Sequence, residues 1–194
     1  GITPLDRQEN DHDDHGHSHG HADPHAWQDP QQVKQMVVNI RDALSAADPQ
    51  GREYFQSRAN AYSKELDQLQ QWAQQQIATI PQSKRAVLTS HDAFAYLGKR
   101  FGIRLLSPQG VSTEAEASAK DVAELIRQMK KTGVRALFME NISNPKLTEQ
   151  IARETGAQIG ARLYSDALSR DAAANSYLAM YRSNIGNLVK GMQN

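Results

Sequence analysis

The sequence predicts an α/β fold, in which a roughly four-stranded parallel sheet flanked by helices follows one long helix. Two observations predict it. From Ser83 onward, short apolar runs alternate with amphipathic helical stretches, the pattern of strands joined by helical crossovers. Before that point, residues 51–79 carry apolar side chains at helical spacing, and Pro81 ends the run.

The first half of the chain is expected to be helical after residue 29. Asp29 is a good N-cap and Pro30 suits the first turn of a helix over residues 30–46. The helix over residues 51–79 would span on the order of 40 Å at about 1.5 Å per residue, a length typical of a helix that links two lobes. Tyr54 belongs to its apolar stripe. A coiled-coil arm is the alternative, which the weak heptad disfavours.

The second half is expected to form the sheet and its covering helices. Strands are predicted at 85–89, 103–106, 134–139 and 158–163, and helices at 93–101, 119–131, 145–155 and 175–192. Ligands of such sheets bind outside the carboxyl ends of the strands. His91, Glu140 and Asp166 follow three of the predicted strands, so we expect them on one rim.

Composition excludes several classes of protein. Lys plus Arg and Asp plus Glu both number 22, which gives no electrostatic reason to expect nucleic acid or an anionic membrane. The chain has no cysteine, so disulfides, thiolate catalysis and thiolate zinc sites are excluded. No run reaches the roughly 20 apolar residues of a membrane span. No signal peptide is visible, and we expect a processed or truncated product.

Residues 1–24 are expected to form a flexible loop, because they hold too few apolar side chains for a core. The loop contains five closely spaced histidines, which are His12, His15, His17, His19 and His21. One hypothesis is that they capture zinc weakly and pass it to a main site, and the alternative is a solubilising tract. Deleting residues 11–21 and measuring the rate of zinc loading distinguishes the two.

Three separated residues are candidate metal ligands. His25 lies in a segment held by two Asp-Pro pairs, although it could be incidental to a helix start anchored by Trp27. A histidine after a strand, such as His91, is more often structural, and Asp166 could be an N-cap. Together, two imidazoles and a carboxylate suit zinc or manganese. Glu140 would either orient an imidazole or form a structural ion pair.

Five segments, in order along the chain, resemble the zinc- and manganese-specific solute-binding proteins of ABC importers, which are periplasmic or surface-anchored. The matching segments are Asp23–Pro30, Ser90–Leu97, Gly110–Ser118, Phe138–Asn141 and Leu163–Ser169. The resemblance implies two lobes joined by a long helix, with a metal ion between them. It assigns His25, His91 and Asp166 as ligands and adds a histidine from the N-terminal lobe, for which this sequence has no match.

The resemblance also sets the expected domains. Residues 25–50 would be a remnant of an N-terminal lobe that is mostly absent, 51–80 the linking helix, and 81–194 the C-terminal α/β lobe. An incomplete N-terminal lobe would expose one side of the linking helix, so we expect contact with the missing lobe or self-association.

The expected function is a high-affinity zinc receptor that delivers its metal to the permease of an ABC importer, and not an enzyme. Imidazole at position 91 and the histidine tract favour zinc, with manganese as the alternative. A metal-dependent adhesin on the same fold is a further alternative. A zinc hydrolase is disfavoured, since the sequence has neither His-Glu-x-x-His nor Gly-x-Ser-x-Gly.

Overall fold

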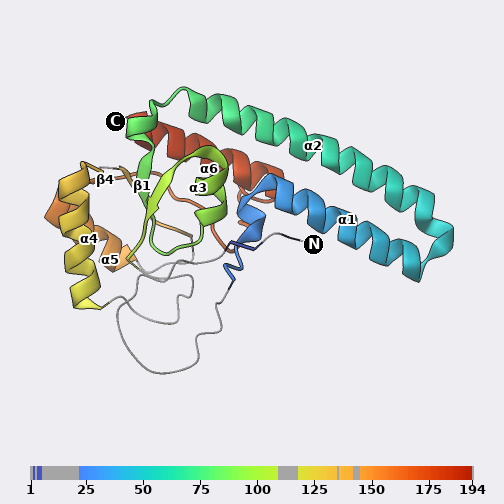
Figure 1. The fold of residues 1–194 in the computed structure, drawn as a ribbon, viewed down its shortest axis with the longest axis horizontal. Coiled ribbons are helices and arrows are strands. Elements are labelled where there is room, and N and C mark those ends of the chain that lie inside the picture. The colour runs from blue at the N-terminus through green and yellow to red at the C-terminus, as the bar shows by residue number, and fades with distance from the viewer. Residues whose placement is uncertain are drawn as a thin grey trace.

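The computed structural model describes residues 2, 4–5, 22–108, 118–134, 136–141 and 145–193. Four parallel strands form one sheet in the order β2-β1-β3-β4, which confirms the predicted sheet (Figure 1). The strands are β1 (Ala86–Leu88), β2 (Arg104–Leu106), β3 (Ala136–Leu137) and β4 (Gln158–Ile159). Each is shorter than the apolar run that predicts it, and an isolated bridge between Glu140 and Leu163 continues the pairing of the last two.

Helices cover both faces of the sheet. They are α3 (Ala95–Phe101), α4 (Ala119–Thr132), α5 (Pro145–Thr155) and α6 (Tyr177–Gln193). One apolar core joins α3, α6 and the end of the long helix to β1 and β3, and a second joins α4 and α5 to the other face. Gly102, Gly133 and Gly156 follow α3, α4 and α5 with positive φ, which ends each helix where the sequence predicts.

Two further helices form a hairpin that extends beyond the sheet (Figure 1). These are α1 (Pro30–Ala47) and α2 (Arg52–Ala78), joined by a short 3-10 turn at Pro49–Gly51. The second half of α2 packs on α6, and there Leu66, Leu69 and Ile77 are buried. Tyr54, which the sequence places in an apolar stripe, is instead 66% exposed. It lies near the start of α2, at the end of the helical hairpin that is farthest from the sheet. Within the described residues, no helix is both long and apolar enough to cross a membrane.

Phe138 directly follows β3 and is fully buried, and two glycines lie against its ring. A Cβ atom on Gly191 of α6 would lie 2.4 Å from its Cζ atom, and one on Gly160 would lie 2.5 Å from its Cε1 atom. The absence of a side chain at both glycines leaves room for this ring, which anchors the chain between β3 and Glu140 in the core.

Gly191→Ala is therefore expected to destabilise the fold by about 1–3 kcal/mol, because the rigid ring must shift in a packed core. Gly186→Ala on the same helix is the matched control. A Cβ there meets nothing within 4 Å, and the helix propensity of alanine should stabilise by up to about 1 kcal/mol. Equilibrium urea unfolding measures both, and equal changes in the free energy of unfolding would contradict this packing.

Candidate metal centre

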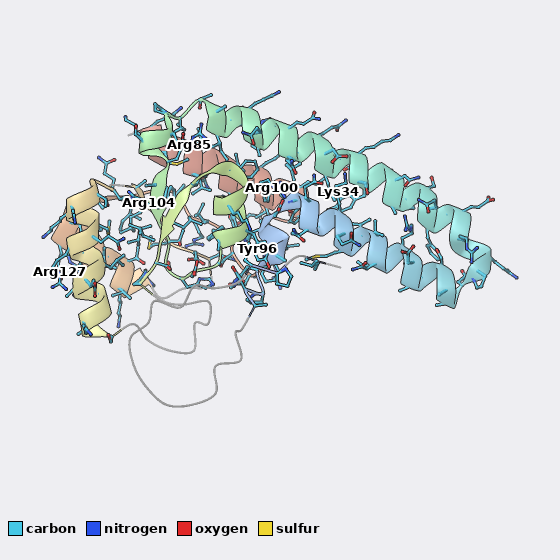
Figure 2. The ribbon with its side chains drawn as sticks, in the orientation of Figure 1. Lys34, Arg85, Tyr96, Arg100, Arg104 and Arg127 are labelled. Atoms are coloured by element: carbon cyan, nitrogen blue, oxygen red, sulfur yellow. The ribbon has the colours of Figure 1, made fainter. Side chains whose placement is uncertain are left out.

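The segment that carries His25 is fixed to the sheet domain through α3. Asp29 accepts a hydrogen bond from the backbone N of Gln31 at 3.0 Å, so it caps α1 as the sequence predicts. Arg100 of α3 donates hydrogen bonds to the same carboxylate through Nε and Nη2, and the Nη2 atom lies 2.6 Å from Oδ2. Tyr96, one turn earlier, donates to the carbonyl of Asp23 at 3.2 Å. Figure 2 shows both α3 side chains where that helix approaches the start of α1.

The same segment is bound to the loop that carries Asp166. The Trp27 Nε1 and Gln28 Nε2 groups both donate to the carbonyl oxygen of Ser165, at 2.9 and 3.0 Å. Asn184 of α6 holds the preceding residue, Tyr164, by accepting from its N at 2.9 Å and donating to its O at 2.8 Å. The positions of His25 and Asp166 are therefore coupled through one buried carbonyl.

His91 follows β1 and is held by Glu140, which follows the adjacent strand β3. The backbone N of His91 donates to Glu140 Oε1 at 2.9 Å, and its Nδ1 atom lies 2.6 Å from Glu140 Oε2. Thr89 donates through its hydroxyl to the carbonyl of His91 at 2.9 Å. Both the imidazole and the carboxylate are buried. Because parallel strands end at one edge of a sheet, adjacent strands bring these two side chains together.

The two imidazoles meet at Asp166. His25 Nε2 lies 3.3 Å from Asp166 Oδ1, and His91 Nε2 lies 3.1 Å from Asp166 Oδ2. Two ligands about 2 Å from a tetrahedral ion lie about 3.3 Å apart, so these spacings suit a common metal. One ligand atom from each residue lies within 4.8 Å of the others, and no other such group occurs in the part of the chain that is described.

The outer nitrogen of each ring contacts a different carboxylate. His25 Nδ1 lies 2.8 Å from Asp23 Oδ1, as His91 Nδ1 contacts Glu140. Histidines that bind metals usually donate their second N–H in this way, which leaves the other nitrogen for the ion. The Asp166 side chain is 26% exposed, so within this chain it is the least covered of the three candidate ligands.

Charge in the metal-free centre is balanced by protons. Burial by itself lowers the pKa of both imidazoles. Hydrogen bonds to carboxylates outweigh this effect and raise the pKa of each ring to about 9. Asp166 contributes to both rings, Asp23 to His25 and Glu140 to His91. Burial raises the pKa of Asp166, but the hydrogen bonds from both rings outweigh it and hold this pKa well below its usual range. Two imidazolium protons carry the charge of one divalent cation, so exchanging them for a metal leaves the net charge unchanged.

The structure thus brings together the three residues that the sequence singles out, and places Glu140 against one of them. The five tract histidines, His12, His15, His17, His19 and His21, lie outside the described residues. Sequence reasoning missed Asp23 as a partner of His25. The available signal was its spacing, since an aspartate often accepts the backbone N–H two residues later, as it does here at 2.9 Å.

Comparison with known proteins gives consistent matches along the chain. The family described as zinc-uptake complex component A, periplasmic (ZnuA), matches residues 1–191. The manganese-binding lipoprotein MntA of Bacillus subtilis is 33% identical over 177 residues, covering 88% of this chain and 58% of that protein. The zinc-binding protein AdcA of Streptococcus pyogenes is 31% identical over 184 residues, covering 93% of this chain and 35% of that protein.

Solved structures agree with the fold. The periplasmic zinc-binding protein TroA of Treponema pallidum superposes with a TM-score of 0.86 at 29% identity, over 97% of this chain and 67% of that one. A manganese-bound mutant of a periplasmic metal-binding protein from Candidatus Liberibacter asiaticus has a TM-score of 0.86 at 28% identity, over 98% and 68%. The chain spans 58% of the length of MntA from Bacillus subtilis and 57% of that from Halalkalibacterium halodurans.

Proposed function

Because the chain belongs to the family of periplasmic zinc-uptake components (ZnuA), we propose that it is a receptor that binds one divalent transition-metal ion through His25, His91 and Asp166. The observation that carries the proposal is the direction of the two rings. Both Nε2 atoms face the same carboxylate, at 3.3 and 3.1 Å, while both Nδ1 atoms contact other carboxylates. The proposed role is to deliver this ion to the permease of an ABC importer, in the periplasm or anchored at the cell surface.

Receptor function is favoured over hydrolysis by how the nearby carboxylates are used. A zinc hydrolase needs a general base beside the metal-bound water. Among the residues that the structure describes, the buried carboxylates beside the rings are Asp23 and Glu140, and each contacts an Nδ1 atom and accepts a backbone N–H of its histidine. Both are therefore committed to orienting ligands, which suits binding and release of an ion.

Zinc is the ion that we propose. Two imidazoles and one carboxylate form a donor set that favours zinc, whereas manganese prefers more oxygen ligands. The relatives are divided, since MntA is described as manganese-binding and AdcA as zinc-binding. The choice therefore rests on the donor atoms of this chain.

Competition between the two metals tests the choice. The metal-free protein is expected to bind one zinc ion in the centre at least about 100-fold more tightly than manganese, because imidazole nitrogen favours zinc. His91→Glu replaces one of the two imidazoles with a carboxylate and should reduce this ratio. Chelator-buffered titrations, repeated without residues 11–21, measure both affinities. Tighter binding of manganese by the unaltered centre, or an unchanged ratio in His91→Glu, would contradict the choice of zinc.

A further inference from the structure

The two carboxylates behind the rings differ in how many of their oxygen atoms face the neighbouring histidine. Glu140 divides its task, because Oε1 accepts from the backbone N of His91 at 2.9 Å while Oε2 lies 2.6 Å from Nδ1. In Asp23 a single atom, Oδ1, serves both donors of its histidine, at 2.9 Å from the backbone N of His25 and 2.8 Å from its Nδ1. Both carboxylates are buried, and the side chain of Glu140 is 0% exposed.

Each ring also has a competing acceptor on its inner side. A neutral imidazole carries one N–H, and a metal ion needs the lone pair of Nε2, so the hydrogen must be on Nδ1. Asp166 Oδ2 lies 3.1 Å from His91 Nε2 and would hold the hydrogen on the wrong nitrogen. Glu140 Oε2 lies closer to Nδ1, at 2.6 Å, and therefore favours the hydrogen on Nδ1 instead.

We propose that Glu140 is a positioning residue that keeps His91 in the Nδ1–H tautomer, so that Nε2 is available to the metal, and that both of its oxygen atoms are needed for this. The inference rests on the proposed function for its consequence in metal binding. The tautomer itself is a property of the metal-free centre. Glu140 therefore acts through His91 and does not contact the ion.

Amide substitutions separate the two carboxylates, because an amide has one acceptor oxygen and one NH₂ group. In Glu140→Gln, only one oxygen remains for the two donors of His91, its backbone N–H and its Nδ1–H. If that oxygen faces Nδ1, the NH₂ group points at the backbone N–H and repels it. If the oxygen faces the backbone N–H, the NH₂ group donates a hydrogen bond to Nδ1. The second arrangement forces the hydrogen onto Nε2, as an amide does beside the histidine of a serine protease triad. In Asp23→Asn, the one oxygen that serves both donors is retained. Both variants lose a carboxylate charge, so their difference isolates the tautomer.

The first measurement is zinc affinity, taken with chelator-buffered zinc at about pH 10, roughly one unit above the pKa of about 9 of both rings, where proton competition is small. Glu140→Gln is expected to bind zinc roughly 10- to 100-fold more weakly than Asp23→Asn, as for other residues that orient metal ligands. Asp48→Asn is the control, because Asp48 accepts two backbone N–H groups in the turn before α2, away from the centre. It should bind as the wild type does. Equal affinities of the Glu140 and Asp23 variants would overturn the inference.

The second measurement is nitrogen NMR of histidine-labelled, metal-free protein at the same pH. Wild type and Asp23→Asn should show a protonated Nδ1 on His91, and Glu140→Gln a protonated Nε2. An unchanged tautomer in Glu140→Gln would refute the inference whatever the affinities are. Failure of the wild type to bind zinc or manganese at the centre would instead refute the proposed function, and the spectra would still decide the role of Glu140.

Discussion

Replacing His91 with alanine is expected to weaken zinc binding by roughly 10²- to 10³-fold. Structural zinc sites with four ligands bind with about 10–16 kcal/mol, so one ligand is worth about 2.5–4 kcal/mol, and each 1.4 kcal/mol is a factor of ten. The variant should also be less stable than the wild type, because Glu140 is left buried without its ring partner. His25→Ala should behave similarly, since it leaves the buried carboxylate of Asp23 without its ring partner.

Asp166→Ala completes the set and has a matched control nearby. It removes the oxygens that face both rings, at 3.3 and 3.1 Å, so a comparable loss of affinity is expected. Asp171 lies in the same loop region and contacts Ser169, so Asp171→Ala should bind zinc normally. Calorimetric titration, combined with circular dichroism to verify folding, measures each variant. Affinity within about threefold of wild type in folded His91→Ala protein would exclude that residue as a ligand.

Zinc affinity is expected to fall steeply with falling pH, by roughly 100-fold per pH unit below about pH 9. Both imidazoles of the metal-free protein have a pKa of about 9, so near neutral pH each ring carries a proton on both nitrogens and is positively charged. Zinc binds the unprotonated rings and must displace both protons, and each proton contributes about a factor of ten per pH unit. Calorimetry in buffers with different ionisation enthalpies should give nearly two protons released per zinc at about pH 7. Release of less than one would contradict the hydrogen-bond network described for the centre.

The same shift has a consequence for stability. The pKa of each ring is raised in the folded state from its ordinary value of 6.5, so the contacts of the imidazolium ions with the carboxylates stabilise the metal-free fold fully below about pH 6.5. This contribution is lost as the pH rises toward 9. Thermal unfolding of metal-free protein should therefore shift to lower temperature across this range. The zinc-loaded protein should not show this shift, because its rings are already unprotonated.

Much of the fold follows from local patterns. Apolar runs separated by helices that end at Gly102, Gly133 and Gly156 indicate parallel strands, and polar residues after the strand ends indicate a ligand rim. His91, Glu140 and Asp166 could be placed together on this basis, because adjacent parallel strands end at one edge. The Asp29 cap and Pro30 likewise identify the start of α1.

Other features could not be predicted, because they depend on contacts between distant segments. The carbonyl of Ser165, which joins the His25 segment to the Asp166 loop, has no signature in a sequence. Nothing local shows that Phe138 lies between Gly160 and Gly191. Tyr54 is exposed because the helical hairpin extends beyond the sheet and its covering helices. Apolar periodicity alone does not reveal how far the hairpin extends.

Anomalous diffraction at the zinc edge, from crystals of the protein loaded with one equivalent of zinc, tests the central claim most directly. It should show zinc bound to the Nε2 atoms of His25 and His91 and to the carboxylate of Asp166, at about 2.0–2.2 Å. The Nδ1 atoms should still contact Asp23 and Glu140. Zinc bound elsewhere, with Asp166 still between the two rings, would contradict the claim.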